Sequence, residues 1–134
     1  MEMASVEIKL FWSEPFGNLT PVCETDVLSE DGIDLLGCLL MDDGGLTEEH
    51  TFNWINEGLK RVDAVISGSS KSQDWDREAW GASISSNSVE VYSLLEESCS
   101  ATLNISSFKA ALKEWQNFIM SEKRPKEVKY VVVQ

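Results

Sequence analysis

The chain has 134 residues, which suits one domain with a single hydrophobic core, and we expect residues 1–134 to form one globular domain. Its formal net charge is -12, from 23 acidic and 11 basic residues. Because nucleic-acid binding depends on clustered Lys and Arg, this charge excludes nucleic acid as the expected partner and favours a basic protein. The plainer alternative is that an acidic surface only keeps the protein in solution.

Cysteine content and hydropathy indicate in which cellular compartment the protein is expected. Cys23, Cys38 and Cys99 are odd in number and form no Cys-x-x-Cys motif, which argues against a disulfide framework. The first ten residues lack the basic segment and apolar core of a secretory signal, and no run of about 18 apolar residues occurs. We therefore expect a cytoplasmic protein without a membrane partner.

Hydrophobic periodicity predicts the first elements. Apolar residues alternate over residues 4–12, which is typical of a half-buried strand, and a short strand over 19–22 is one interpretation of the next segment. Ser29 followed by two acidic residues resembles a helix start, so we favour a helix through Met41. Gly32 and Gly37 weaken this interpretation, and a strand over 33–41 is the alternative.

Two long helices are the clearest elements of the sequence. Thr47 is expected to cap a helix that continues to Ser67, with Glu48 and Glu49 at the positive end of its dipole. Ser106 is expected to cap a second helix over residues 107–121. Both segments repeat apolar residues at spacings of three and four, which indicates one buried face on each helix.

The remaining segments predict strands and a loop. Residues 67–78 read as a polar loop, 80–85 and 89–92 as a hairpin, 101–105 as a short strand, and 127–133 as the last strand. Strands and long helices do not alternate as βαβ units. The prediction is therefore an α+β fold in which a mainly antiparallel sheet is packed by two long helices.

No catalytic pattern accompanies the titratable residues. His50, the single histidine, has no serine or cysteine motif beside it, so we expect no catalytic residue and no enzyme activity. No calcium-loop, zinc or phosphate-binding motif occurs, and we expect no metal and no cofactor. Asp74, Asp76 and Glu78 alternate and would share one face if extended. A metal-dependent hydrolase that uses them is a less favoured alternative.

Acidic residues are instead the candidates for protein binding. Residues 23–49 hold nine carboxylates and no Lys or Arg, and a fixed negative surface suits a positively charged partner. Trp75, flanked by two carboxylates, would be an interface anchor if exposed, and ordinary packing is its alternative role. The predicted contact residues are Asp42, Asp43, Glu48, Glu49, Asp74, Trp75, Asp76 and Glu78.

Four short motifs in the C-terminal half resemble those of a known group of proteins. The motifs are A-W-G at 79–81, V-E-V-Y at 89–92, L-L-E-E at 94–97 and F-K-x-A-L-x-x-W-x-x-F at 108–118. Over residues 47–120 the chain thus resembles bacterial immunity proteins of contact-dependent growth inhibition and bacteriocin systems.

The resemblance implies a cytoplasmic protein without catalytic residues that binds and neutralises a cognate toxin, which in many such systems is a tRNA- or DNA-cleaving nuclease. An acidic adaptor or chaperone for a secreted effector is the alternative function. The oligomeric state stays open.

Overall fold

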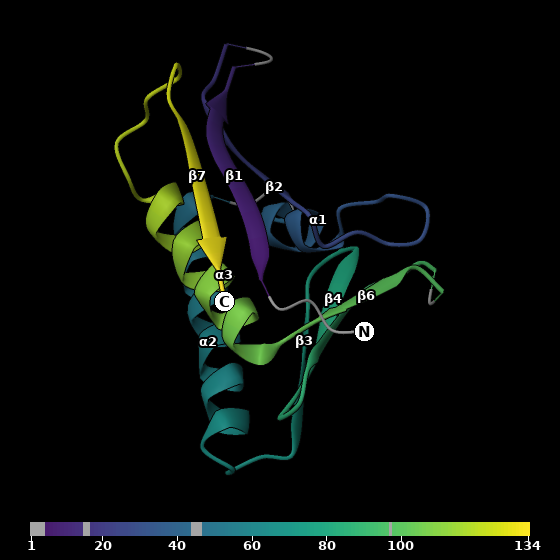
Figure 1. The fold of residues 1–134 in the computed structure, drawn as a ribbon. Coiled ribbons are helices and arrows are strands. Elements are labelled where there is room, and N and C mark those ends of the chain that lie inside the picture. The colour runs from purple at the N-terminus through teal and green to yellow at the C-terminus, as the bar shows by residue number, and fades with distance from the viewer. Residues whose placement is uncertain (1–4, 15–16, 44–46, 97) are drawn as a thin grey trace.

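The computed structural model describes residues 5–14, 17–43, 47–96 and 98–134. This part of the chain forms two antiparallel sheets and three helices in one compact domain (Figure 1). The elements are β1 Val6–Ser13, β2 Thr20–Thr25, α1 Leu35–Met41, α2 Glu48–Ile66, β3 Ser72–Asp76, β4 Trp80–Ser85, β5 Val89–Ser93, β6 Ser100–Leu103, α3 Ile105–Ile119 and β7 Val128–Val133. None of these helices is long and apolar enough to cross a membrane.

The predicted α+β class is confirmed, and the finer architecture differs from the prediction. The strands divide between a three-stranded sheet, β2-β1-β7, and a four-stranded sheet, β3-β4-β5-β6. In Figure 1, α2 and α3 lie side by side, with the three-stranded sheet above them and the four-stranded sheet to their right. Helix α2 therefore packs mainly against the four-stranded sheet and α3 mainly against the three-stranded sheet, whereas α1 contacts both sheets.

Strand β1 is the centre of the three-stranded sheet and confirms the expected alternation. Val6, Ile8, Leu10 and Trp12 are buried, whereas the residues between them are partly or fully exposed. The Trp12 ring stacks on Phe118 of α3 with centroids 5.2 Å apart. This contact fixes the inner face of the sheet against the helix, and the other face is left to solvent.

The prediction of a polar loop over residues 67–78 was wrong in part, because Ser72–Asp76 within it form strand β3. Only Trp75 among its five residues is a large apolar side chain, so the sequence lacks a strand signal there. The Trp75 side chain is 0% exposed, stacks on Trp54 of α2 at 6.1 Å and meets Phe108 of α3 edge-on at 6.3 Å. Burial of this one ring anchors the strand to both long helices.

The capping predictions have mixed outcomes. Thr47 is the N-cap of α2, because its side chain accepts a hydrogen bond from the backbone N–H of His50. Ser106 is not the cap of α3. Asn104 is, since its Oδ1 accepts from the N–H of Ser107 at 2.7 Å, and the helix begins at Ile105. The preceding strand consequently ends at Leu103, earlier than predicted.

Helix α1 confirms the helical interpretation of the segment before Met41 and excludes the strand alternative. Its predicted start was wrong: the cap is Asp34, whose carboxylate accepts from the N–H of Gly37 at 2.9 Å. Ser29 instead closes a turn by accepting from the N–H of Ile33, at 3.1 Å. Gly32 has a φ of 83° in that turn, a conformation that strongly favours glycine.

Candidate protein-binding surface

The outer face of the four-stranded sheet carries carboxylates from neighbouring strands. Asp74 and Asp76 of β3 are exposed and point away from the helices, on the opposite side of the strand from Trp75. In the ladder, Asp74 lies opposite Ser83, which lies opposite Glu90. Adjacent strands are about 4.8 Å apart, so Asp74 and Glu90 are separated by about 10 Å.

Tyr92 lies within this group of carboxylates and is held in place. Its hydroxyl donates to Asp76 Oδ1 at 2.9 Å. Asp76 and Tyr92 both pair with Gly81, which has no side chain between them. A Cβ atom at Gly81 would lie 2.9 Å from the Tyr92 ring and would also meet the Asp76 carboxylate. Glycine therefore allows the ring to lie across β4 toward Asp76.

The surroundings of Tyr92 affect its ionisation. Loss of water around the ring, the hydrogen bond to Asp76, and the negative charges of Asp76, Asp74 and Glu90 all raise the pKa of the Tyr92 hydroxyl above its ordinary value. The hydroxyl therefore keeps its proton, which it donates to Asp76, to a higher pH than an ordinary tyrosine would.

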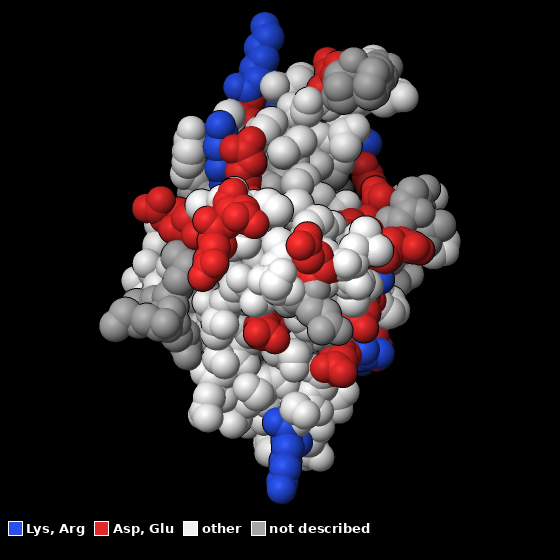
Figure 2. Space-filling model, turned by 90° about the vertical axis from the view of Figure 1, so that its right-hand side faces the viewer, with Lys and Arg blue, Asp and Glu red and all other residues white. Residues whose placement is uncertain are grey.

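We call Asp74, Asp76, Glu90 and Tyr92 the acidic face. The segments that form strands β3 to β6 contain no Lys or Arg, so no cation on these strands offsets the carboxylates. Figure 2 shows the side of the molecule on which the four-stranded sheet lies in Figure 1. Asp and Glu are spread over it, and the most prominent Lys and Arg side chains project at its upper and lower ends.

Asp42, a predicted contact residue, joins two parts of the fold. Its Oδ2 accepts from the N–H of Ala79 at 2.8 Å, and its carbonyl accepts from Arg77 Nε at 2.5 Å. Asp42 thus ties the end of α1 to the turn between β3 and β4. The structure brings the two predicted acidic regions together at this point, and the role of Asp42 there is structural.

Arg77 is the cation at this junction. Its guanidinium lies over the Trp54 ring at 5.2 Å. Burial lowers the pKa of Arg77, while Asp42, Asp43 and Glu78 oppose that shift. Glu78, the third predicted residue of the alternating group, is exposed in this turn and lies outside β3. Asp74 and Asp76 alone share the face of the strand.

The other predicted acidic residues lie near the start of α2. Asp43 and Glu48 line a hollow of about 390 Å³ whose walls are mostly apolar and which lies among β2, α1, α2 and α3. Glu48 also pairs with Lys123 at 3.2 Å, which partly neutralises it. Glu49 is exposed on the first turn of α2. These side chains are therefore placed around this hollow and the helix start.

The prediction that Trp75 is an exposed interface anchor was wrong. Its side chain is fully buried, so it cannot contact a partner without rearrangement of the core. It touches the backbone of α2 at Gly58, where a Cβ atom would lie 2.8 Å from Trp75 Cε2. The aromatic residue that the strand ladder places among the exposed carboxylates is Tyr92.

Sequence reasoning missed Glu90 and Tyr92, although a signal was present. In Val89-Glu90-Val91-Tyr92 the two valines are buried, and alternation sends the other two side chains to the opposite face. Their proximity to Asp74 and Asp76 depends on the register of two hairpins. That register was not fixed as long as β3 was interpreted as a loop.

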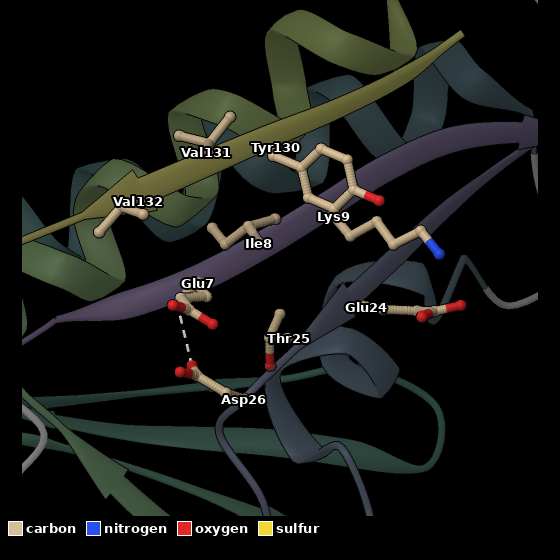
Figure 3. A pocket seen from close by; sticks show the side chains of 9 residues that line it. All are labelled: Glu7, Ile8, Lys9, Glu24, Thr25, Asp26, Tyr130, Val131 and Val132. Atoms are coloured by element: carbon tan, nitrogen blue, oxygen red, sulfur yellow. Dashed lines mark hydrogen bonds between the residues drawn. The ribbon is translucent and has the colours of Figure 1, made fainter.

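A second hollow, of about 380 Å³, lies on the outer side of the three-stranded sheet (Figure 3). Glu7, Glu24, Asp26 and Lys9 surround it, so charges of both signs meet there. The backbone N–H of Glu7 donates to Asp26 at 3.0 Å. Among the described residues, no group of three or more His, Cys, Asp or Glu is placed to hold a metal ion.

Comparison of the chain with protein-family models, curated proteins and solved structures gives no match. The resemblance to immunity proteins therefore stays a prediction that rests on the motifs within residues 47–120.

Proposed function

We propose that this protein is a cytoplasmic immunity protein that binds a basic toxin, a tRNA- or DNA-cleaving nuclease domain, through the acidic face and thereby neutralises it. The single observation that carries the proposal is the placement of Asp74, Asp76 and Glu90 on one exposed sheet face whose strands have no Lys or Arg. The motif resemblance over residues 47–120 supports the same function.

Charge complementarity gives this face two advantages. A nuclease domain must present positive charge to phosphates, so a carboxylate surface competes for the same groups. Opposite charges also steer the partners together and speed association, and this effect weakens as salt screens the charges. Carboxylates spaced about 7 Å along β3 and about 10 Å across the strands match several cations at once.

Tyr92 supplies the central contact of the proposed interface. Tyrosine combines a large apolar ring with a polar group, and such residues dominate the energetics of many protein interfaces. The hydrogen bond to Asp76 restricts the ring before binding, so little conformational entropy is lost when a partner covers it. A Lys or Arg side chain of the partner can lie over this ring.

The alternative function is an acidic adaptor or chaperone for a secreted effector, which would use the same charge. An inhibitor must abolish the activity of its partner, whereas an adaptor releases a partner that remains active. Nuclease activity of the captured partner, measured with and without this protein, separates the two.

The proposal is tested with the double variant D74K/E90K, because both side chains are exposed and neither is a hydrogen-bond partner of Tyr92. We expect its affinity for the captured toxin to fall by roughly 100-fold or more, since close charge pairs at interfaces contribute several kcal/mol. The matched control is E7K/E24K, which makes the same charge change on the three-stranded sheet. Equal affinity of D74K/E90K and the unmodified protein would reject the acidic face as the binding surface.

A further inference from the structure

The two sheets have four edge strands, and three of them are protected against pairing with another chain. Strand β2 contains Pro21, and α1 lies along it: the N–H of Cys23 donates to Met41 Sδ at 3.3 Å and that of Thr25 to Asp34 Oδ2 at 2.6 Å. At β3, the Asp74 carbonyl accepts from Arg61. Strand β6 is only four residues long. Short strands, proline and covered backbone groups are common protections of sheet edges.

Strand β7 lacks these protections. Its six residues contain no proline, and it pairs with β1 on one side only. Among the described residues, the structure records no hydrogen bond from another element to the backbone of Val128–Val133 outside the β1 ladder. The loop that follows α3 passes near the beginning of β7 in Figure 1.

The outward side chains of β7 are apolar and exposed. Val128 is 45% exposed, Tyr130 75% and Val132 61%. Figure 3 shows the Tyr130 ring beside Lys9, on the outer side of the sheet. Lys129 is the strand's single charged residue and pairs with Glu114 of α3 at 3.2 Å. An open edge with an apolar face and no uncompensated charge is suited to strand addition.

We propose that β7 pairs with β7 of a second copy of this chain, antiparallel and around a two-fold axis at Tyr130. This register places Tyr130 opposite Tyr130 of the second copy and Val128 opposite Val132 at both ends. The exposed side chains that face one another across the new ladder are then all valine or tyrosine, and apolar and aromatic residues form favourable cross-strand pairs. The two three-stranded sheets become one six-stranded sheet through an isologous interface.

Charge supports a second copy as the occupant. Two chains that each carry -12 repel one another over most of their surfaces, so association requires a region without excess acid. Residues 109–134 contain six basic and three acidic residues, the reverse of the rest of the chain. Of the Lys and Arg residues near β7, Lys129 pairs with Glu114, Lys123 with Glu48 and Arg124 with Glu122. These ion pairs limit the charge that two β7 edges bring together.

This inference is independent of the proposed function. The acidic face belongs to the four-stranded sheet, and pairing through β7 uses the other sheet. A dimer would present two acidic faces and would bind two toxin molecules. Loss of dimerisation would leave each acidic face intact, and loss of toxin binding would leave the dimer intact.

The molar mass of the purified full chain in solution tests the proposal. We expect twice the chain mass of 15.0 kDa when the protein is measured by light scattering at about 100 µM, because so small an interface should have a Kd of roughly micromolar order. The variants Y130K and V132K should be monomers, since Y130K places a Lys at the centre of the apolar stripe and V132K places one at each end of the new ladder. The control T20K adds the same charge at the exposed start of β2 and should remain a dimer.

Cross-linking tests the register without loss of apolar character. In the pairing centred on Tyr130, the two Cys residues of Y130C are directly opposite and within disulfide reach. Those of V132C are four residues apart along the strand, or about 13 Å, and should not cross-link. A covalent dimer of Y130C and none of V132C is the expected result, with the unmodified chain as the blank for its native cysteines. A monomeric unmodified chain at about 100 µM, dimeric Y130K, or equal cross-linking of both Cys variants would overturn the proposal.

Discussion

The two sheets of this protein are alike on their inner faces and opposite on their outer faces. Each buries an aromatic ring against the long helices, Trp12 from the three-stranded sheet and Trp75 from the four-stranded sheet. Outside, the four-stranded sheet presents carboxylates and Tyr92 without a Lys or Arg on its strands. The three-stranded sheet presents the apolar stripe of β7 beside charges of both signs.

In both sheets, buried apolar residues and exposed polar residues alternate along the same strands. In β3, Trp75 attaches the strand to α2 and α3, whereas its neighbours Asp74 and Asp76 face solvent. The inner residue is constrained by close packing, and the outer residues are free to carry charge. Substitutions at inner and at outer positions separate the contribution of packing from that of charge.

Replacement of Trp75 by Ala should weaken the attachment of the four-stranded sheet most. The ring is fully buried against Trp54 and Phe108, so W75A should lower the free energy of unfolding by about 3–5 kcal/mol. Chemical denaturation followed by tryptophan fluorescence and by circular dichroism measures this. The control is Y130A, whose side chain is 75% exposed and whose loss should cost less than about 0.5 kcal/mol in the monomer. A similar cost for both variants would contradict the assignment of inner and outer roles.

Replacement of Asp34 by Ala tests how the edge of the three-stranded sheet is held. Its carboxylate accepts from the N–H and hydroxyl of Thr25 and from the N–H of Gly37, and so joins β2 to α1. Loss of a helix cap and of partners for half-buried donors should cost about 2 kcal/mol of unfolding free energy. D34N keeps one acceptor oxygen and should lose less than D34A. Equal stability of D34A and the unmodified protein would show that the hydrogen bonds to Asp34 do not stabilise this edge.

Replacement of Tyr92 by Phe is the smallest expected change and tests the organisation of the acidic face. Loss of the hydrogen bond to Asp76 should cost about 1 kcal/mol of unfolding free energy at neutral pH. The folded protein raises the pKa of Tyr92 above that of the unfolded chain, so the folded state binds more protons once the pH exceeds about 10. The stability contributed by Tyr92 is therefore present below about pH 10 and is lost as the pH rises further.

Denaturation of the unmodified protein and Y92F at about pH 8 and about pH 11 measures this dependence. The difference in unfolding free energy between the two proteins should shrink at the higher pH. A difference that stays constant would mean that Asp76 and the neighbouring carboxylates do not hold the Tyr92 proton.

Local patterns were sufficient to predict part of the fold. The apolar repeats of α2 and α3 and the alternation in β1 and the β4–β5 hairpin depend only on neighbouring residues, and these elements are confirmed. The division into two sheets was not predictable in this way. Val6 pairs with Val133, and no local pattern specifies a pairing across the whole length of the chain.

The candidate site was predicted only in part for the same reason. Asp74 and Asp76 were identified from their charge, and their alternation placed them on one face once the segment proved extended. Glu90 and Tyr92 join them through strand register, which the sequence does not display. Trp75 was misplaced because its segment was interpreted as a loop, in which alternation does not assign the ring to the face opposite its two neighbouring carboxylates. Asn104 and Ser106 are both residue types that favour the N-cap, so the local sequence did not distinguish them, and the cap in the structure is Asn104.

Capture of the partner from the source cell with the unmodified chain and with D74K/E90K tests whether the acidic face binds a toxin. We expect the unmodified chain to retain a basic nuclease domain at equal stoichiometry and to abolish its activity, and the charge-reversed chain to lose both effects while E7K/E24K retains them. If D74K/E90K retains the same nuclease and inhibits it equally, the acidic face of the four-stranded sheet is not the binding surface.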